Sequence, residues 1–177
     1  MKKQKNNSVF KSNEPIYNEK YFRYPLNSIS SLSYCAPIYQ IYWKDVYLYT
    51  DIYGLFLLTL LTCASLLWWA LSYRWIQILD LYAVIATKTW MLSNILQQPI
   101  INLCPLYFLF NQNNITTKYT AMILTTLILY FGRYSYGNNI FMLSIVSKLS
   151  DTYCGNRYGT AVFHILSAIS IYMFFEN

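Results

Sequence analysis

An uninterrupted apolar run from Ile52 to Tyr73 constrains this chain more than any other feature. Its 22 residues contain no charged side chain and no proline. As an α-helix the run extends for roughly 33 Å, enough to cross a bilayer hydrocarbon core of about 30 Å. Trp68, Trp69 and Trp75 cluster near its end, and tryptophan and tyrosine are enriched at membrane interfaces. The sequence therefore predicts an integral membrane protein.

The composition supports this class. Only 11% of the residues are charged, against about 25% in soluble domains. The net charge of +6 comes from scattered Lys and Arg without a basic helix or binding motif, so we expect no nucleic acid partner. A basic N-terminal tail near anionic lipid is the favoured interpretation, and the positive-inside rule keeps the N-terminus on the side of synthesis.

Two regions differ in character. Residues 1–50 are polar, rich in tyrosine and interrupted by Pro15, Pro25 and Pro37. Prolines break long helices, and the segment shows no apolar stripe with a period of 3.6 residues. We predict an extended N-terminal arm that lies over partner proteins, followed by a helical membrane region over residues 51–177.

The segment from Arg74 to Gln98 allows two interpretations, because it contains neither glycine nor proline. A tight turn near Arg74 would start a second span. Alternatively, one helix of about 45 residues would leave the membrane and project from it. Asp80 and Lys88 lie eight residues apart on one helix face, too far apart for a direct pair. An isolated charge at membrane depth costs on the order of 3 kcal/mol, so both are candidates for a proton or quinone path or for pairing with another subunit; we favour pairing.

The rest of the chain offers shorter apolar segments. Residues 99–110 are too short to span and indicate a re-entrant or interfacial piece. The segment that begins at Tyr119 would complete a span only by continuing past Phe131 to Tyr136, with Arg133 reaching the interface. The apolar stretches of this part are residues 119–131, 140–146 and 160–175. We therefore expect an all-α protein with two to four transmembrane helices, three being the best estimate.

His164 is the only histidine of the chain and lies in an apolar segment. Neutral imidazole is a common axial ligand of haem iron, so one hypothesis is a cofactor-binding residue that holds haem. A second histidine would then come from a partner subunit, as in the membrane anchors of succinate dehydrogenase. The favoured alternative is a histidine hydrogen-bonded to a neighbouring helix.

No enzyme motif is present. The sequence contains no Gly-rich phosphate loop, no HExxH and no GxSxG, and we expect no catalytic residue and no metal site. Cys35, Cys63, Cys104 and Cys154 are far apart and form no CxxC pair, which favours free thiols. The protein is not expected to act as an enzyme by itself.

The abundance of Tyr, Asn, Ile and Phe, together with the broken apolar segments, resembles the orphan (Ymf-type) reading frames of ciliate mitochondrial genomes. The resemblance covers the full length and is one of composition. It implies a mitochondrially encoded subunit of an inner-membrane respiratory complex, with its N-terminus on the matrix side and with bound lipids that include cardiolipin.

The expected function is thus that of a structural, accessory or highly divergent core subunit that supports assembly and electron transport. Such a chain holds no cofactor alone. The alternative is a redox-active anchor, similar to that of succinate dehydrogenase, that binds haem b through His164 at a subunit interface or quinone near Arg133. The host complex and the roles of Asp80 and Lys88 stay open.

Overall fold

The computed structural model describes residues 24–44, 48–71, 73–103, 105, 114–133, 135–154 and 158–175, and the side chains of residues 119 onward in the fifth range. Every regular element of this part is helical, which confirms the all-α prediction for it. In chain order the elements are α1 (Pro25–Ser31), η1 (Leu32–Tyr34), α2 (Cys35–Tyr42), α3 (Tyr49–Leu71), α4 (Arg74–Leu96), η2 (Pro99–Leu103), α6 (Asn114–Phe131), α7 (Tyr136–Cys154) and α8 (Gly159–Phe174).

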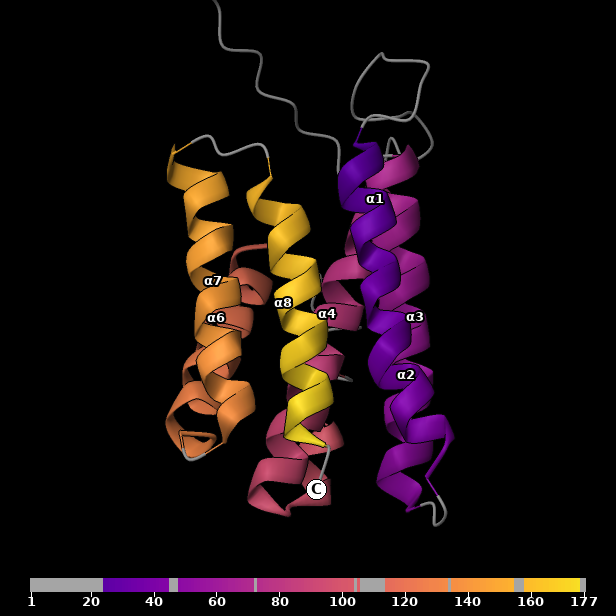
Figure 1. The fold of residues 1–177 in the computed structure, drawn as a ribbon, viewed down its shortest axis with the longest axis vertical. Coiled ribbons are helices and arrows are strands. Elements are labelled where there is room, and N and C mark those ends of the chain that lie inside the picture. The colour runs from indigo at the N-terminus through magenta and orange to yellow at the C-terminus, as the bar shows by residue number, and fades with distance from the viewer. Residues whose placement is uncertain are drawn as a thin grey trace, which may run out of the picture.

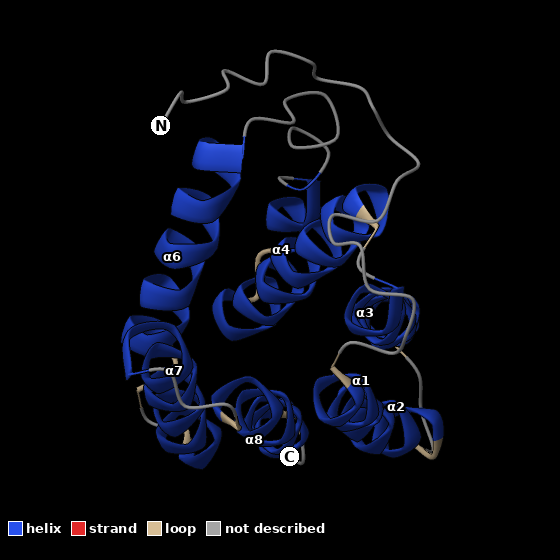
Figure 2. Cartoon of the chain, turned by 90° about the horizontal axis from the view of Figure 1, so that it is seen from above, coloured by secondary structure: helices blue, strands red, loops and turns tan. Residues whose placement is uncertain are grey.

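The helices close into a ring. α3 packs on α4, α4 on α6, α6 on α7 and α7 on α8, and α1 completes the ring by contacting both α8 and α3. The view from above shows these helices around a common centre (Figure 2). In the side view α1 and α2 follow one another as one rod beside α3 (Figure 1). The first and last helices are therefore neighbours.

The prediction of an extended arm is wrong for residues 25–42, which are helical. Pro25 occupies the first turn of α1, where the backbone N–H has no intrahelical acceptor to lose. Pro37 follows the 3₁₀ turn η1 that joins α1 to α2. Ser28 also ties α1 to α3, because its hydroxyl donates to the carbonyl oxygen of Leu66 at 2.9 Å. This part of the N-terminal segment thus belongs to the same bundle as residues 51–177, whereas residues 1–23 lie outside the described residues.

The rod has a buried stripe that apolar periodicity does not reveal. Its members recur every three or four residues, but most of them are small or polar: Asn27, Ser30, Ser31, Tyr34, Pro37 and Ile41. Small side chains allow two helix backbones to approach closely. The stripe therefore packs well without being hydrophobic.

α3 and α4 form a hairpin, and the single long helix is excluded. Tyr73 adopts an extended backbone (φ −76°, ψ 138°) immediately before α4 begins, and α4 then packs back along α3. The indole of Trp90 on α4 lies over Gly54 on α3. α4 ends at Gln97, whose left-handed backbone (φ 53°) terminates the helix.

The helix that contains residues 119–131 extends toward the N-terminal side of this segment and not toward Tyr136. α6 begins at Asn114 and ends at Phe131, so the continuation to Tyr136 is wrong. Residues 140–146 belong to a helix of 19 residues, α7. Gly137 on α7 lies so close to α8 that a Cβ there would come within 2.8 Å of the Ser170 carbonyl oxygen.

One helix among the described residues, α3, is both long and apolar enough to cross a membrane by length and composition. The apolar stretch Tyr119–Phe131 and helix α8 are shorter. Length and composition thus support one crossing.

Candidate functional site

His164 lies on the inner face of α8 and contacts α1. Only 5% of its surface is exposed, and its Nδ1 lies 2.9 Å from Oγ of Ser30 and 3.4 Å from Oγ of Ser31. The Ser30 hydroxyl also lies 2.9 Å from the carbonyl oxygen of Asn27. The imidazole and the Ser30 hydroxyl thus share a hydrogen bond, and the tautomer of the ring decides which of the two donates.

A chain of hydroxyls continues from this contact across the bundle. Ser31 reaches Oγ of Ser65 on α3 at 3.1 Å, and the Ser65 hydroxyl lies beside the Asp80 carboxyl on α4. Oδ1 of Asp80 has no hydrogen-bond partner within the described part of the chain. We call His164, Ser30, Ser31, Ser65 and Asp80 the histidine–aspartate network. It joins four helices through polar side chains at their contact faces.

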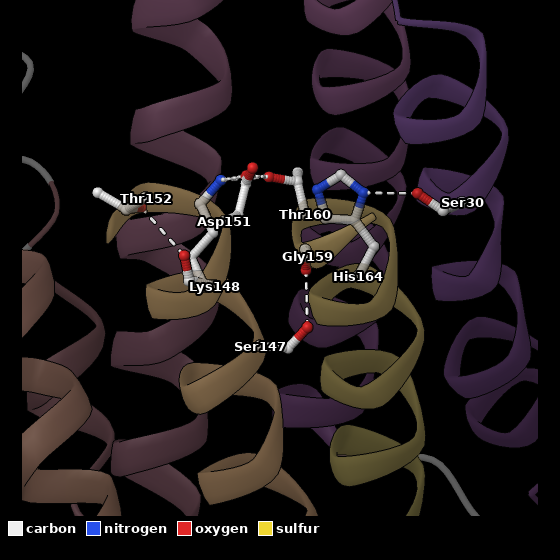
Figure 3. Close-up of polar contacts among 8 residues, drawn as sticks. All are labelled: Ser30, Ser147, Lys148, Asp151, Thr152, Gly159, Thr160 and His164. Carbon is white, nitrogen blue, oxygen red and sulfur yellow. Dashed lines mark hydrogen bonds and ion pairs between the residues drawn. The ribbon is translucent and has the colours of Figure 1, made fainter. Parts of the chain in front are cut away.

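A second polar group lies beside this network, at the end of the bundle where α7 gives way to α8 (Figure 3). Nζ of Lys148 lies 2.6 Å from Oγ1 of Thr160 and 3.5 Å from Oδ2 of Asp151. The Thr160 hydroxyl also bonds to the Asp151 carboxylate. Lys148 further lies 5.6 Å above the ring of Trp69, which is itself 6.2 Å from the His164 ring. Lys148 and Asp151 thus pair with each other and with Thr160 of the same chain.

The side chain of Lys88 forms hydrogen bonds with α6. Its Nζ donates to Oγ1 of Thr125 at 2.7 Å and to the carbonyl oxygen of Ala121 at 3.3 Å. Asp80 and Lys88 therefore do not pair with each other, as their spacing indicated. Lys88 instead bonds to neutral groups of α6, and Asp80 lies beside Ser65 of α3.

The other candidates lie apart from the network. Arg133 is exposed in the turn after α6, with its guanidinium 5.3 Å from the centre of the Tyr130 ring. Cys35, Cys63 and Cys154 are free and exposed, which confirms the prediction for these three; Cys104 lies outside the described residues. No group of three His, Cys, Asp or Glu side chains that could hold a metal ion occurs in the described ranges.

The surroundings of His164 do not suit a haem. Nδ1 is engaged by Ser30, so Nε2 is the nitrogen left to bind iron, but this second ring nitrogen faces Thr160 of its own helix (Figure 3). The rings of Tyr34, Trp69 and Phe163 surround the imidazole at centroid distances of 6.1, 6.2 and 5.8 Å. A flat macrocycle needs open space on the Nε2 side. This arrangement favours the interpretation that His164 bonds to a neighbouring helix.

Sequence reasoning missed the serines. Ser30, Ser31 and Ser65 lie in segments that were treated as an extended arm and as an apolar span. The only signal was their spacing, since residues 27, 30, 31 and 34 recur at helical intervals. Such a stripe is detected by counting small residues rather than apolar ones.

No protein-family model, curated protein or solved structure matches this chain.

Proposed function

We propose that the chain is a structural membrane subunit of a mitochondrial respiratory-chain complex, with α3 and several of its neighbours crossing the inner membrane. The proposal combines the compositional resemblance with the arrangement of polar and apolar side chains on the bundle. In this role the chain supports the assembly of the complex, and its outer face contacts lipid and other subunits.

The observation that carries the proposal is the inverted polarity of α8. Its outward side chains are apolar: Val162, Ile165, Ile169 and Tyr172 are all exposed. Its inward side chains include His164, Ser167 and Ser170, which are buried. A helix of a water-soluble protein faces its apolar side inward. The pattern of α8 suits a helix that meets lipid or another apolar surface outside and polar partners inside.

Other helices of the ring also expose apolar side chains. On α3 Ile52, Phe56 and Leu67 are exposed, and the buried face combines Thr62 and Ser65 with Leu57, Leu58 and Leu61. On α7, Met142, Leu143 and Val146 are exposed, and Ser144 is buried. Large exposed apolar patches on a soluble monomer mark interaction surfaces or aggregation hazards.

The internal bonding of the charges supports a structural role over transport. Lys88 and Lys148 are each hydrogen-bonded to groups of this chain, and such bonding lowers the cost of keeping a charge at membrane depth. Bound charges stabilise the bundle and leave its outer face free for neighbours.

The test is a native gel of mildly solubilised mitochondrial membranes, with mass spectrometry to locate the chain. We expect it to migrate with a large oxidoreductase complex, and we expect its deletion to lower the amount of that assembled complex. Migration as a low-mass species, or normal assembly after deletion, would overturn the proposal. Alkaline extraction of the same membranes separately tests integration, because an integral chain stays in the pellet.

A further inference from the structure

A small cavity lies inside the ring of helices. It has a volume of about 40 Å³ and is lined by side chains of η1, α3, α4, α7 and α8. Its walls are mostly apolar, but four polar side chains border it: Tyr34, Thr87, Lys88 and Ser167. No sequence pattern indicated that these four residues lie close together.

Two hydroxyls at the cavity have no partner. Oγ1 of Thr87 and Oγ of Ser167 are buried and lack a hydrogen-bond partner among the described residues, and their residues are only 3% and 4% exposed. The phenol of Tyr34 lies beside Ser167 but outside hydrogen-bonding geometry. Leaving a buried hydroxyl unpaired costs about 1–3 kcal/mol. These residues line the same cavity, so one guest can satisfy them.

Lys88 adds a donor to the same space. An ammonium has three N–H groups, and the structure gives two acceptors for them, Thr125 and Ala121 on α6. The side chain also borders the cavity. An acceptor in the cavity would therefore complete the coordination of the ammonium.

The size of the cavity determines the class of guest. Sites for drug-sized molecules and cofactors measure about 300–1,000 Å³, so a quinone ring or an acyl chain is far too large for about 40 Å³. A buried water needs about 10–15 Å³ and two to four polar partners. We propose that this cavity is an internal hydration site, in which one to three water molecules bridge Thr87, Ser167 and Lys88 and connect them to Tyr34.

The hydration site would solvate the Lys88 charge beside the cavity. Water accepts from the ammonium and donates to the threonine and serine oxygens, so every group at the cavity is paired. This assignment does not depend on the proposed respiratory role, because it follows from the packing of the bundle alone.

Radical footprinting of the full chain in its native membranes tests the proposal directly. Ionising radiation converts bound water into hydroxyl radicals, which oxidise side chains next to it. Met91 lines the cavity and is only 2% exposed, so a dry cavity would leave it unmodified. We expect oxidation of Met91 in the unsubstituted protein and at least a threefold lower rate in Thr87→Val. An unmodified Met91 in the unsubstituted protein would overturn the proposal.

A matched pair of substitutions gives a second test. A hydrated cavity and a dry cavity predict shifts of the melting temperature in opposite directions. Thr87→Val keeps the shape of the side chain but removes the hydroxyl. In a hydrated cavity it deprives water of a partner, and we expect the melting temperature in mild detergent to fall by about 2–4 °C. In a dry cavity it removes an unpaired polar group, and the melting temperature would rise.

The control is Thr89→Val on the same helix. Thr89 is equally buried, but its hydroxyl donates to the Ile85 carbonyl oxygen at 2.8 Å and does not need water. Both shifts are measured from the unsubstituted protein, and Thr89→Val shows the effect of losing a hydroxyl that bonds within its own helix. A melting temperature of Thr87→Val above that of the unsubstituted protein contradicts hydration.

Discussion

Trp90 occupies the space that a side chain at position 54 would need. A methyl group on Gly54 would overlap the six-membered part of the indole ring. The ring cannot easily move away, because its Nε1 donates to the carbonyl oxygen of Thr50 at 2.8 Å and its face stacks on Phe175 at 4.6 Å. The contact therefore fixes how α3 and α4 cross and brings the C-terminus against the hairpin.

Gly54→Ala should destabilise the bundle by about 1–3 kcal/mol, the usual cost of overpacking a well-filled site. Thermal unfolding of the purified chain in mild detergent measures the loss. Cys63→Ala, at an exposed position of the same helix, is the control and should change stability by less than about 0.5 kcal/mol. Equal effects of the two changes would show that the Trp90 contact does not constrain the hairpin.

Ser30→Ala and His164→Ala should be coupled. Each removes one side of the 2.9 Å contact between α1 and α8, so the double variant should lose about 1 kcal/mol less than the sum of the single variants. A double-mutant cycle on unfolding free energies measures this coupling. Additive losses would mean that the contact contributes nothing.

The visible absorbance of the assembled complex separates the two interpretations of His164. A histidine that only joins helices predicts an unchanged b-type haem signal in His164→Asn, per assembled complex. The asparagine keeps a hydrogen-bonding group at this position, so the bundle should still assemble. Loss of the signal would instead assign a haem to this chain.

Thr160→Val should cost about 1.5–3 kcal/mol, because the Thr160 hydroxyl bonds to both Lys148 and Asp151 and bonds to charged groups are the stronger class. Thr152→Val is the matched control on α7. Its exposed hydroxyl bonds only to the Lys148 carbonyl oxygen, and we expect a change below about 0.5 kcal/mol. Similar losses in urea unfolding of both variants would contradict the role given to Thr160.

Ile165→Lys combined with Ile169→Lys should release the chain from the membrane fraction or prevent its accumulation. Both positions lie on the outward face of α8, where each lysine costs about 2.5–3.5 kcal/mol at the centre of a membrane helix. Asn139→Lys on α7 is exposed but polar and should have little effect. Normal alkaline-resistant retention of the double variant would place α8 outside the lipid.

The sequence was sufficient to predict the parts of the fold that depend on local composition. The apolar run after Ile52 became α3, and the aromatic residues near its end lie at a helix terminus. The hairpin at Tyr73 was one of two open alternatives, because no glycine or proline marks the turn. Packing of α4 against α3 decided between them, and that information is tertiary.

The errors have a common physical origin. Hydropathy recognises helices whose buried face is apolar, but the rod of α1 and α2 buries serines and α7 buries Gly137 and Ser144. Partners of Lys88 and His164 lie 37 and 134 residues away, so no local pattern could identify them. His164 was recognised as a candidate from its residue type, whereas its bond to Ser30 required the fold.

The contact between α1 and α8 also sets the order in which the bundle can be completed. Ser30 and His164 are separated by 134 residues, which take about 7–27 s to synthesise at 5–20 residues per second. During that interval the helix that covers the serine face of α1 has not yet been made. The ring of helices can therefore close only after α8 has been synthesised.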